Sequence, residues 1–250
     1  MKAKAIIQTN ELTKFYGKQV AVDHLTFEVH EGEIFGFLGP NGAGKTTTLL
    51  MLLGLSEPTS GTAKVMDINP TREPILVKRH IGYLQENMGF YRDLNARQTL
   101  KFITDLNEIP DDIANERIET SLKTVGLENV ENKLLSAYSR GMRQRLGIAE
   151  VLVKSPKIAF LDEPTLGLDP DTTNRLIEMI QLLSKEKKMT ILLSSHLLYQ
   201  VQRICDRVGI MINGKMVVHG EMDKLAEEKL GVGKESYSLE ELYMKYFQEN

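Results

Sequence analysis

The chain has 250 residues and a formal net charge of -3, and 42% of its residues are hydrophobic and 26% are charged. A chain of this length and composition can bury a sizeable core without disulfides or metals, which excludes a mini-protein, a disordered chain and a coiled coil. Its 31 Lys and Arg residues are balanced by 34 Asp and Glu residues, so it has no overall basic footprint for a nucleic-acid backbone. We therefore expect a globular protein whose main partner is not a nucleic acid.

Short runs typical of β-strands recur along the chain, and the later ones are separated by segments of helical length. In chain order, the expected strands are residues 6–8, 21–29, 34–38, 63–66, 81–84, 157–161, 190–193, 208–212 and 216–219. Strands that alternate with helices predict a largely parallel sheet covered on its faces, whereas the closely spaced early strands predict an attached antiparallel piece. The sequence therefore predicts an α/β core with a small antiparallel β subdomain.

Helical patterns replace the strand signal in the middle of the chain. They predict a helical insertion over about residues 87–154, with breaks between its helices at Asp111, Ser139 and Gly141. This insertion interrupts the α/β core rather than following it, because strand signals resume beyond it.

The end of the chain predicts one more helix. Residues 231–234 have the composition of a hinge, and residues 238–247 place apolar side chains on one helical face. We therefore expect one domain over residues 1–230 and a short amphipathic helix within residues 231–250. The apolar residues of this helix are Leu239, Leu242, Tyr243, Tyr246 and Phe247.

No segment predicts a membrane span or a secretory signal. The longest apolar runs, such as residues 49–55, are far shorter than the roughly 20 residues that cross a bilayer, and the N-terminus turns polar early. The single cysteine, Cys205, has no Cys or His neighbours at metal-ligand spacing, so we interpret it as a buried thiol. These features indicate a cytoplasmic protein.

A glycine-rich segment, residues 39–46, follows the predicted strand 34–38 and precedes a helix-forming stretch. Its pattern is a Walker A motif, in which glycines let backbone amides point at phosphates and a helix N-terminus adds positive charge. In such a loop Lys45 reaches the β and γ phosphates, and the Thr46 hydroxyl is a ligand for Mg²⁺. A glycine-rich turn without a ligand is the competing interpretation. The predicted nucleotide-binding residues are Asn41, Gly42, Ala43, Gly44, Lys45, Thr46 and Thr47.

Two adjacent carboxylates, Asp162 and Glu163, follow the apolar strand 157–161. In an open α/β sheet, ligands bind beyond the carboxyl ends of the strands. Asp162 is therefore a candidate to hold Mg²⁺ through its water shell, and Glu163 is a candidate general base for a water that attacks the γ phosphate. His196 follows the next predicted strand and is a candidate third catalytic residue. A solvated acidic pair that caps the following turn is the alternative interpretation.

Residues 138–146 lie shortly before this strand and resemble the signature motif of ATP-binding cassette (ABC) ATPases, whose usual form is Leu-Ser-Gly-Gly-Gln. Ser139 and Gly141 are kept, whereas Arg140 replaces the first glycine, Met142 replaces the glutamine and a tyrosine replaces the leucine. A helical stretch begins at this glycine, so the serine and the local amides can form a second anion-binding helix N-terminus. Together with the Walker A motif before it and the acidic pair after it, this segment makes nearly the whole chain similar to that family.

The resemblance implies a RecA-like P-loop NTPase core with an antiparallel β subdomain and an inserted helical subdomain. It also implies further site residues. Tyr16 corresponds to an aromatic that stacks on adenine, with a half-buried core tyrosine as the alternative. Residues 167–169 resemble the D-loop, and His196 resembles the switch histidine. Glu86, or alternatively Gln85, corresponds to the Q-loop residue that contacts Mg²⁺ or its water.

In this family, the signature motif of one cassette covers the γ phosphate bound by another. The resemblance therefore implies an ATP-sandwich dimer of two copies, in which Ser139, Gly141 and Met142 contact the partner's ATP. It implies ATP and Mg²⁺ as cofactors, and hydrolysis that drives a separate membrane permease, which would hold the chain at the inner face of the cell membrane. The candidate permease-docking cluster consists of Phe90, Tyr91, Leu94 and Phe102, although such an aromatic cluster is more often plain core.

The tail and the signature variant resemble exporter-type members, which implies export of a drug, peptide, lipid, polysaccharide or ion. The competing hypotheses are a non-transport ABC ATPase of the translation or DNA-repair type, a P-loop kinase or GTPase, and a regulatory cassette. A translation-type ATPase would have two cassettes and a DNA-repair ATPase would have long coiled coils, and neither feature is present in this sequence. The guanine-specificity or acceptor motif of a GTPase or kinase is likewise not present. An intact set of Lys45, Asp162, Glu163 and His196 argues against the third. The resemblance leaves open whether the dimer contains identical or different subunits.

Overall fold

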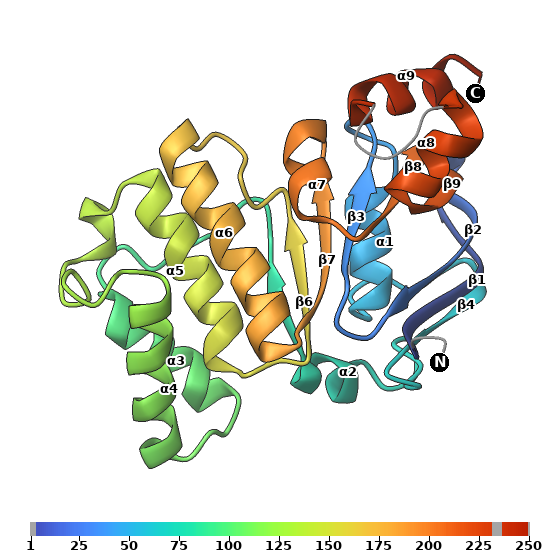
Figure 1. Cartoon of the computed structure of the whole chain (residues 1–250). Coiled ribbons are helices and arrows are strands. Elements are labelled where there is room, and N and C mark those ends of the chain that lie inside the picture. Colours follow the sequence, from blue (N-terminus) through green and yellow to red (C-terminus); the bar gives the residue numbers. More distant parts are fainter. Residues whose placement is uncertain (1–3, 232–236, 250) are drawn as a thin grey trace.

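The computed structural model describes residues 4–231 and 237–249 and contains two β-sheets with helices between and around them (Figure 1). The larger sheet has six strands in the order β5-β6-β7-β3-β8-β9, of which the first five are parallel and the last is antiparallel to its neighbour. Its central strands are buried over their whole length, as expected for a parallel sheet covered on both faces. These strands are β3 (Ile34–Leu38), β5 (Ile81–Leu84), β6 (Ile158–Asp162), β7 (Thr190–Ser195), β8 (Arg207–Ile212) and β9 (Lys215–Glu221).

The smaller sheet is antiparallel, with the order β2-β1-β4. In β2, alternate residues from Leu25 to Val29 are buried, which is the pattern of a strand with one face on the core. Gly17 has φ +59° in the turn between the first two strands. All nine predicted strands are present, so the predicted α/β core with an antiparallel subdomain is confirmed. The three strands are β1 (Ala5–Tyr16), β2 (Gln19–His30) and β4 (Ser60–Val65).

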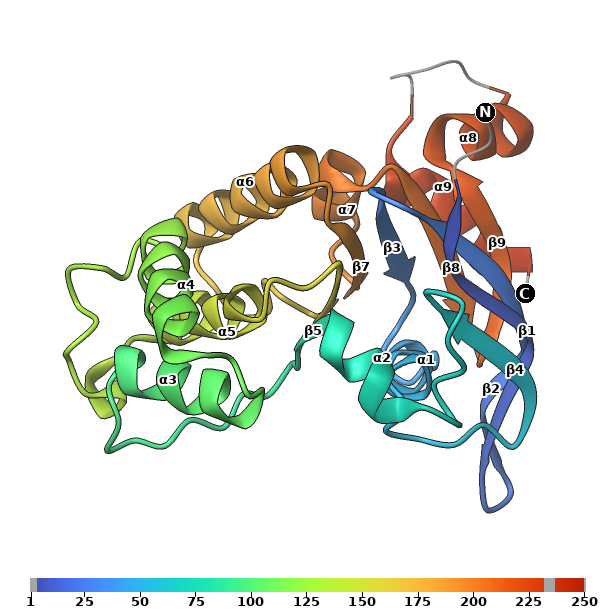
Figure 2. The same ribbon diagram turned by 90° about the horizontal axis from the view of Figure 1, so that it is seen from below.

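Helix α1 (Lys45–Leu52) lies between the two sheets, and α2 (Pro74–His80) lies beside it, next to β5 (Figure 2). Three phenylalanines, Phe27, Phe35 and Phe37, form the centre of this layer, with ring centroids 5.0–5.8 Å apart. On the other face of the main sheet lie α6 (Pro170–Lys187) and α7 (Leu198–Ile204). The sheet is thus covered on both faces, and its carboxyl edge is left for the loops.

A separate group of helices extends from the main sheet on the side of β5 (Figures 1 and 2). The first helix of this group, α3, begins with a capping box, because the Asn95 side chain accepts from the Gln98 amide and the Gln98 side chain accepts from the Asn95 amide. The last helix of the group, α5, packs on α3, on α4 and on β5, so it joins the helical group to the main sheet. The group lies within the predicted insertion and comprises α3 (Ala96–Leu106), α4 (Asp111–Thr124), the 3-10 turn η1 (Leu135–Ala137) and α5 (Arg140–Val153).

The chain ends in α8 (Met222–Leu230) and α9 (Leu239–Glu249), the second of which is the predicted C-terminal helix. Leu239 and Leu242 are fully buried, whereas Phe247 is 44% exposed, so only part of the predicted apolar face is covered. Of the predicted hinge, Gly231 ends α8 with φ +68°, and the remaining positions lie outside the described residues. In the part of the chain that the structure describes, no helix is long and apolar enough to cross a membrane.

Candidate active site

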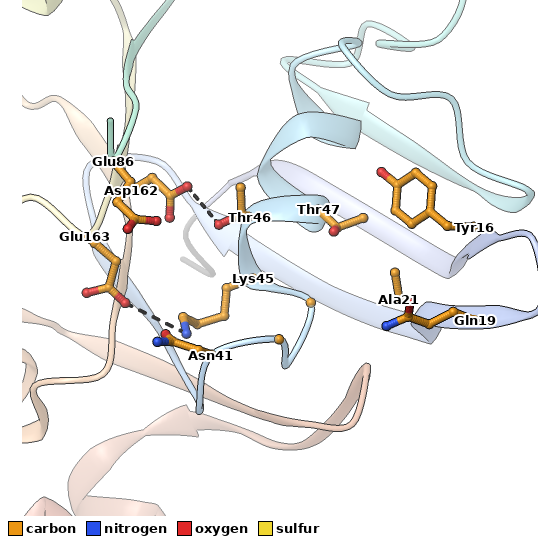
Figure 3. A pocket seen from close by; sticks show the side chains of 12 residues that line it. Tyr16, Gln19, Ala21, Asn41, Lys45, Thr46, Thr47, Glu86, Asp162 and Glu163 are labelled. Atoms are coloured by element: carbon orange, nitrogen blue, oxygen red, sulfur yellow. Dashed lines mark hydrogen bonds and ion pairs between the residues drawn. The ribbon is translucent and has the colours of Figure 1, made fainter. Parts of the chain in front are cut away.

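A cavity of about 340 Å³ lies where the loops after β3 and β6 meet the antiparallel sheet. Figure 3 shows a tyrosine at one end of this cavity, carboxylates at the other end, and the glycine-rich loop between them. The lining combines basic, hydroxyl, amide and acidic groups, which suits a polar, multiply charged ligand better than an apolar one. The lining residues are Tyr16, Gln19, Ala21, Asn41, Gly42, Gly44, Lys45, Thr46, Thr47, Glu86, Asp162 and Glu163.

The glycine-rich loop leads from β3 directly into α1. Gly44 has φ +100°, and a Cβ at this position would lie 2.4 Å from the Ala21 carbonyl oxygen, so only glycine fits there. Helix α1 begins at Lys45 without a side-chain cap, which leaves its N-terminus able to bind an anion. Ala43, a predicted ligand residue, donates its amide to the Pro40 carbonyl at 3.1 Å and has a buried side chain. The loop is therefore built to bring backbone close to a phosphate.

Lys45 is 6% exposed and donates to the carbonyl oxygens of Gly39 at 2.7 Å and Pro40 at 3.2 Å. Its Nζ also lies 3.8 Å from Glu163 Oε1 (Figure 3). Burial lowers the pKa of Lys45, and the negative charge of Glu163 opposes that shift. The lysine is thus a buried cation that already points toward the acidic end of the cavity.

Asp162 is almost completely buried and accepts two hydroxyl hydrogen bonds. Thr46 Oγ1 donates to its Oδ2 at 2.8 Å, and Ser194 Oγ donates to its Oδ1 at 2.5 Å. These bonds fix the carboxylate between the start of α1 and the end of β7. Ser194 was not predicted as a site residue, although its position at a strand's carboxyl end was the available signal.

Glu163 begins the loop after β6 with φ +48°, a backbone conformation that is uncommon outside glycine. Its amide donates to the Ser194 side chain at 3.1 Å, and its Oε2 lies 3.0 Å from His196 Nδ1. Among the described side chains, its Oε1 is a buried polar atom without a hydrogen-bond partner. A buried carboxylate with a free oxygen beside the cavity can accept a proton from a water molecule. His196 does not line the cavity itself and reaches it through Glu163.

The oxygen groups at the acidic end fit Mg²⁺, which takes one or two carboxylates and otherwise water and phosphate oxygens. Thr46, Asp162 and Glu86 line this end of the cavity, whereas Gln85 is not among the lining residues. Within residues 4–231 and 237–249, no group of three or more His, Cys, Asp or Glu side chains could hold a metal by itself. A cation here would therefore complete its coordination with oxygens from water or from the ligand.

Tyr16 lies at the opposite end of the cavity, and the residue is 50% exposed. Lys14 Nζ lies 5.1 Å from the ring centroid, and the Tyr16 hydroxyl is 3.5 Å from Ser56 Oγ. The exposed part of the ring can stack on a planar group. Gln19 and Ala21, which the sequence analysis missed, line the same end. Their spacing of two along β2 is the signal that they share a face.

The three predicted signature residues lie away from this cavity. Ser139 is the N-cap of α5 and accepts from the Met142 amide at 3.2 Å. Neither residue lines the cavity, and neither does Gly141. One chain therefore presents two separate places where an anion could meet a helix N-terminus.

Comparisons with known proteins agree with this geometry. Residues 22–166 match the model of the family described as "ABC transporter". The bacitracin transport ATP-binding protein BcrA of Bacillus licheniformis is 44% identical over 220 residues, which cover 88% of this chain and 71% of BcrA. A solved ATP-binding subunit of an ABC transporter has a TM-score of 0.86 and 29% identity, covering 97% of this chain and 99% of its own. The structure of cbiO1 from Clostridium perfringens has a TM-score of 0.81 and 28% identity, covering 90% and 92%.

The family match spans more than half of the chain and includes both the glycine-rich loop and the carboxylate pair. The overall fold matches that of an ATP-binding subunit along almost the whole chain, so the predicted P-loop NTPase core is confirmed. The chain therefore belongs to the ABC transporter family, as an ATP-binding subunit that hydrolyses ATP.

Proposed function

We propose that the cavity binds ATP with Mg²⁺, with the adenine on the Tyr16 ring and the phosphates on the glycine-rich loop. The distribution of groups supports this orientation, because the one aromatic among the described lining residues lies at one end and the lysine and carboxylates lie at the other. Residues 41–47 would surround the phosphates. Thr46, Asp162 and Glu86 would hold the Mg²⁺, which when bound neutralises charge on the β and γ phosphates.

Glu163 is the proposed general base. Its unpartnered Oε1 lies beside the lysine that would grip the γ phosphate, so a water between them could give its proton to this oxygen. His196 would hold the Glu163 carboxylate through Oε2 and act at the γ phosphate with it. Lys45 must exchange its bonds to the Gly39 and Pro40 carbonyls for phosphate oxygens, which replaces neutral acceptors with charged ones.

Two copies of the chain would form the working unit. The separation of the signature residues from the cavity supports this, because Ser139, Gly141 and Met142 can reach nucleotide only in another subunit. In a two-fold dimer, the α5 N-terminus of each chain would close over the γ phosphate of the other. Hydrolysis and loss of phosphate would weaken this contact and open the dimer.

The proposed biological role is export through a separate membrane permease, which would place the chain at the cytoplasmic face of the cell membrane. The 44% identity to a protein described as a bacitracin transport ATP-binding protein supports transport over the translation or DNA-repair alternatives. Tyr91 is 66% exposed and Phe102 is 43% exposed, with ring centroids 6.0 Å apart. Exposed aromatic residues at the start of the helical group suit docking of an apolar permease helix.

We also propose that residues 1–230 form the ATPase domain, with the helical group as an insertion, and that α9 supports α7. The Leu239 amide donates to Gln202 Oε1 at 2.8 Å, which links the C-terminal helix to the helix after His196. This arrangement makes the tail part of the domain's packing rather than a free extension.

The observation that carries the proposal is the buried cluster of Lys45, Asp162 and Glu163 in one cavity with an exposed tyrosine. The test is Glu163→Gln, which keeps the size of the side chain and removes the base. We expect hydrolysis to fall by about 10²- to 10⁴-fold, as for loss of a general base, while ATP binding persists. With ATP and Mg²⁺ the variant should elute as a dimer in size-exclusion chromatography with light scattering.

The control is Glu178→Gln, which makes the same chemical change at an exposed position on α6. It should hydrolyse ATP at the wild-type rate. A strictly monomeric Glu163→Gln protein at saturating ATP would remove the dimer. The transporter role is tested by co-purification with a permease from membranes, where reconstitution should change the ATPase rate.

A further inference from the structure

The loop of residues 163–168, which follows the proposed base, is fixed at several points. It contains two turn bonds, from the Leu166 amide to the Glu163 carbonyl at 3.1 Å and from the Leu168 amide to the Thr165 carbonyl at 3.2 Å. The buried Gln200 side chain of α7 accepts from Thr165 Oγ1 at 2.5 Å. This loop, named the 163–168 loop below, is therefore tied at its first half to the elements around Glu163.

The second half of the 163–168 loop is held by an arginine from another element. Arg140, the first residue of α5, donates from Nη2 to the Leu166 carbonyl oxygen at 2.7 Å. The guanidinium lies against Gly167, where an added Cβ would come 2.3 Å from Arg140 Cζ. Gly167 itself has φ +70°. Glycine at this position thus provides both the backbone conformation and the space for the flat guanidinium.

A second contact joins the same two elements. A Cβ added to Gly141 would lie 3.0 Å from the Thr172 side chain at the start of α6, so the N-terminus of α5 packs closely on the element that follows the loop. Arg140 and Gly141 directly follow Ser139, the N-cap of α5. The residue between Ser139 and Gly141 is therefore in contact with the loop that begins at the chain's own Glu163.

We infer that Arg140 is a positioning residue that links the Ser139 end of α5 to the 163–168 loop of the same chain. This inference rests on the proposed dimer, in which Ser139 closes over the partner's γ phosphate. When that closure orders the start of α5, Arg140 holds the Leu166 carbonyl and with it the backbone that sets the direction of Glu163. The family's usual glycine at this position has no side chain to make such a link, so the device belongs to chains with a long donor here.

The chemistry of arginine separates this role from a simple charge effect. If the positive charge of Arg140 acted on the partner's phosphate, lysine would preserve it. A planar guanidinium can donate to Leu166 while lying flat on Gly167, whereas a lysine ammonium is a compact donor without a flat face. The comparison of Arg140→Lys with wild type therefore tests geometry at constant charge.

The experiment measures kcat and KM for ATP hydrolysis by the full chain with Mg²⁺. We expect Arg140→Lys and Arg140→Gly each to lower kcat by about fivefold to tenfold, the effect of losing one solvent-exposed hydrogen bond, with KM for ATP changed less than twofold. KM should hold because Arg140 does not line the chain's own cavity. Full kcat in Arg140→Lys overturns the inference, and so does a loss confined to KM.

The matched control is Arg117→Lys. Arg117 also donates to a backbone carbonyl, that of Lys154, but it lies on α4 and does not contact the loop. Its kcat should stay within twofold of wild type. An equal loss in this control would show that general loosening of the helical group explains the effect, which also overturns the inference.

A double-mutant cycle with Gly167→Ala gives an independent test. The new methyl group would occupy the place of the guanidinium, so it should lower kcat in the wild-type background and have a smaller effect when Arg140 is already lysine. Strictly additive effects on kcat overturn the link. If wild type hydrolyses ATP and Glu163→Gln forms the ATP-bound dimer, a negative result here refutes the role of Arg140 alone and leaves the proposed function intact.

Discussion

The Ser194 hydroxyl is a buried contact that joins the Asp162 carboxylate to the backbone amide of Glu163. Its Oγ donates to Asp162 Oδ1 at 2.5 Å and accepts from the Glu163 amide at 3.1 Å, and Ser194 is fully buried. Ser194→Ala removes the donor to a buried charged group. The substitution also removes one of the two acceptors of the Glu163 amide. The other acceptor, the Ser194 backbone carbonyl at 3.2 Å, remains.

The expected cost follows from the charge of the acceptor. A hydrogen bond to an ionised group contributes about 1.5–3 kcal/mol, and the loss at the amide is softened by the remaining carbonyl. We therefore expect the free energy of unfolding to fall by about 2–3 kcal/mol. For a chain of this size the midpoint of thermal unfolding should fall by about 4–12 °C.

The assay is urea unfolding at pH 7 without nucleotide, supported by calorimetry and by ATP hydrolysis. The control is Ser184→Ala in α6, where a buried hydroxyl donates to the neutral Gly32 carbonyl at 3.2 Å. This change should cost less than about 1 kcal/mol, because the acceptor is uncharged and alanine favours the helix. Equal losses in the two variants would refute the reasoning from the Asp162 charge.

Two further predictions concern binding and pH. Tyr16→Ala should weaken ATP binding by about fivefold to a hundredfold, because base stacking on an aromatic contributes about 1–3 kcal/mol, whereas Tyr16→Phe should bind like wild type. Titration with a fluorescent ATP analogue measures the affinity. Unchanged affinity in the alanine variant would exclude the ring as the adenine platform. Burial raises the pKa of Glu150 on α5 to about 7. The folded chain therefore holds a proton on Glu150 that the unfolded chain releases near pH 4.5. As pH rises between these two values, the contribution of Glu150 to the free energy of unfolding decreases. Glu150→Gln should therefore gain about 1–3 kcal/mol of unfolding free energy at pH 8 and little at pH 4.5, after allowance for partial exposure; a gain of equal size at both pH values in urea unfolding would contradict the assignment.

Much of the fold and half of the site are encoded locally. Continuous apolar runs such as residues 34–38 predict buried parallel strands, and the glycine pattern before Lys45 predicts the loop because φ values near +100° demand glycine. The two carboxylates at the carboxyl end of β6 were predictable as well, because ligands of an open α/β sheet bind beyond the strand ends. These features depend on neighbours in the sequence, and a single sequence displays them directly.

The Q-loop position shows where local information ends. Gln85 and Glu86 are adjacent and both can contact a cation, so their sequence leaves both candidates open. The direction of the backbone after β5 places Glu86 in the cavity lining and leaves Gln85 out of it. In an extended chain, neighbouring side chains point to opposite sides. Tertiary contacts decide which of the two sides faces the cavity.

By itself, the sequence determined the chemical groups and the order in which the chain supplies them. Only the tertiary structure decided their partners, because β7 lies between β6 and β3 and pairs Asp162 with Ser194 in register. The bond from Arg140 to the Leu166 carbonyl depends likewise on how α5 packs beside the 163–168 loop. Strand order and helix packing join residues that are 26 to 32 positions apart, and no periodicity along the chain records such distances.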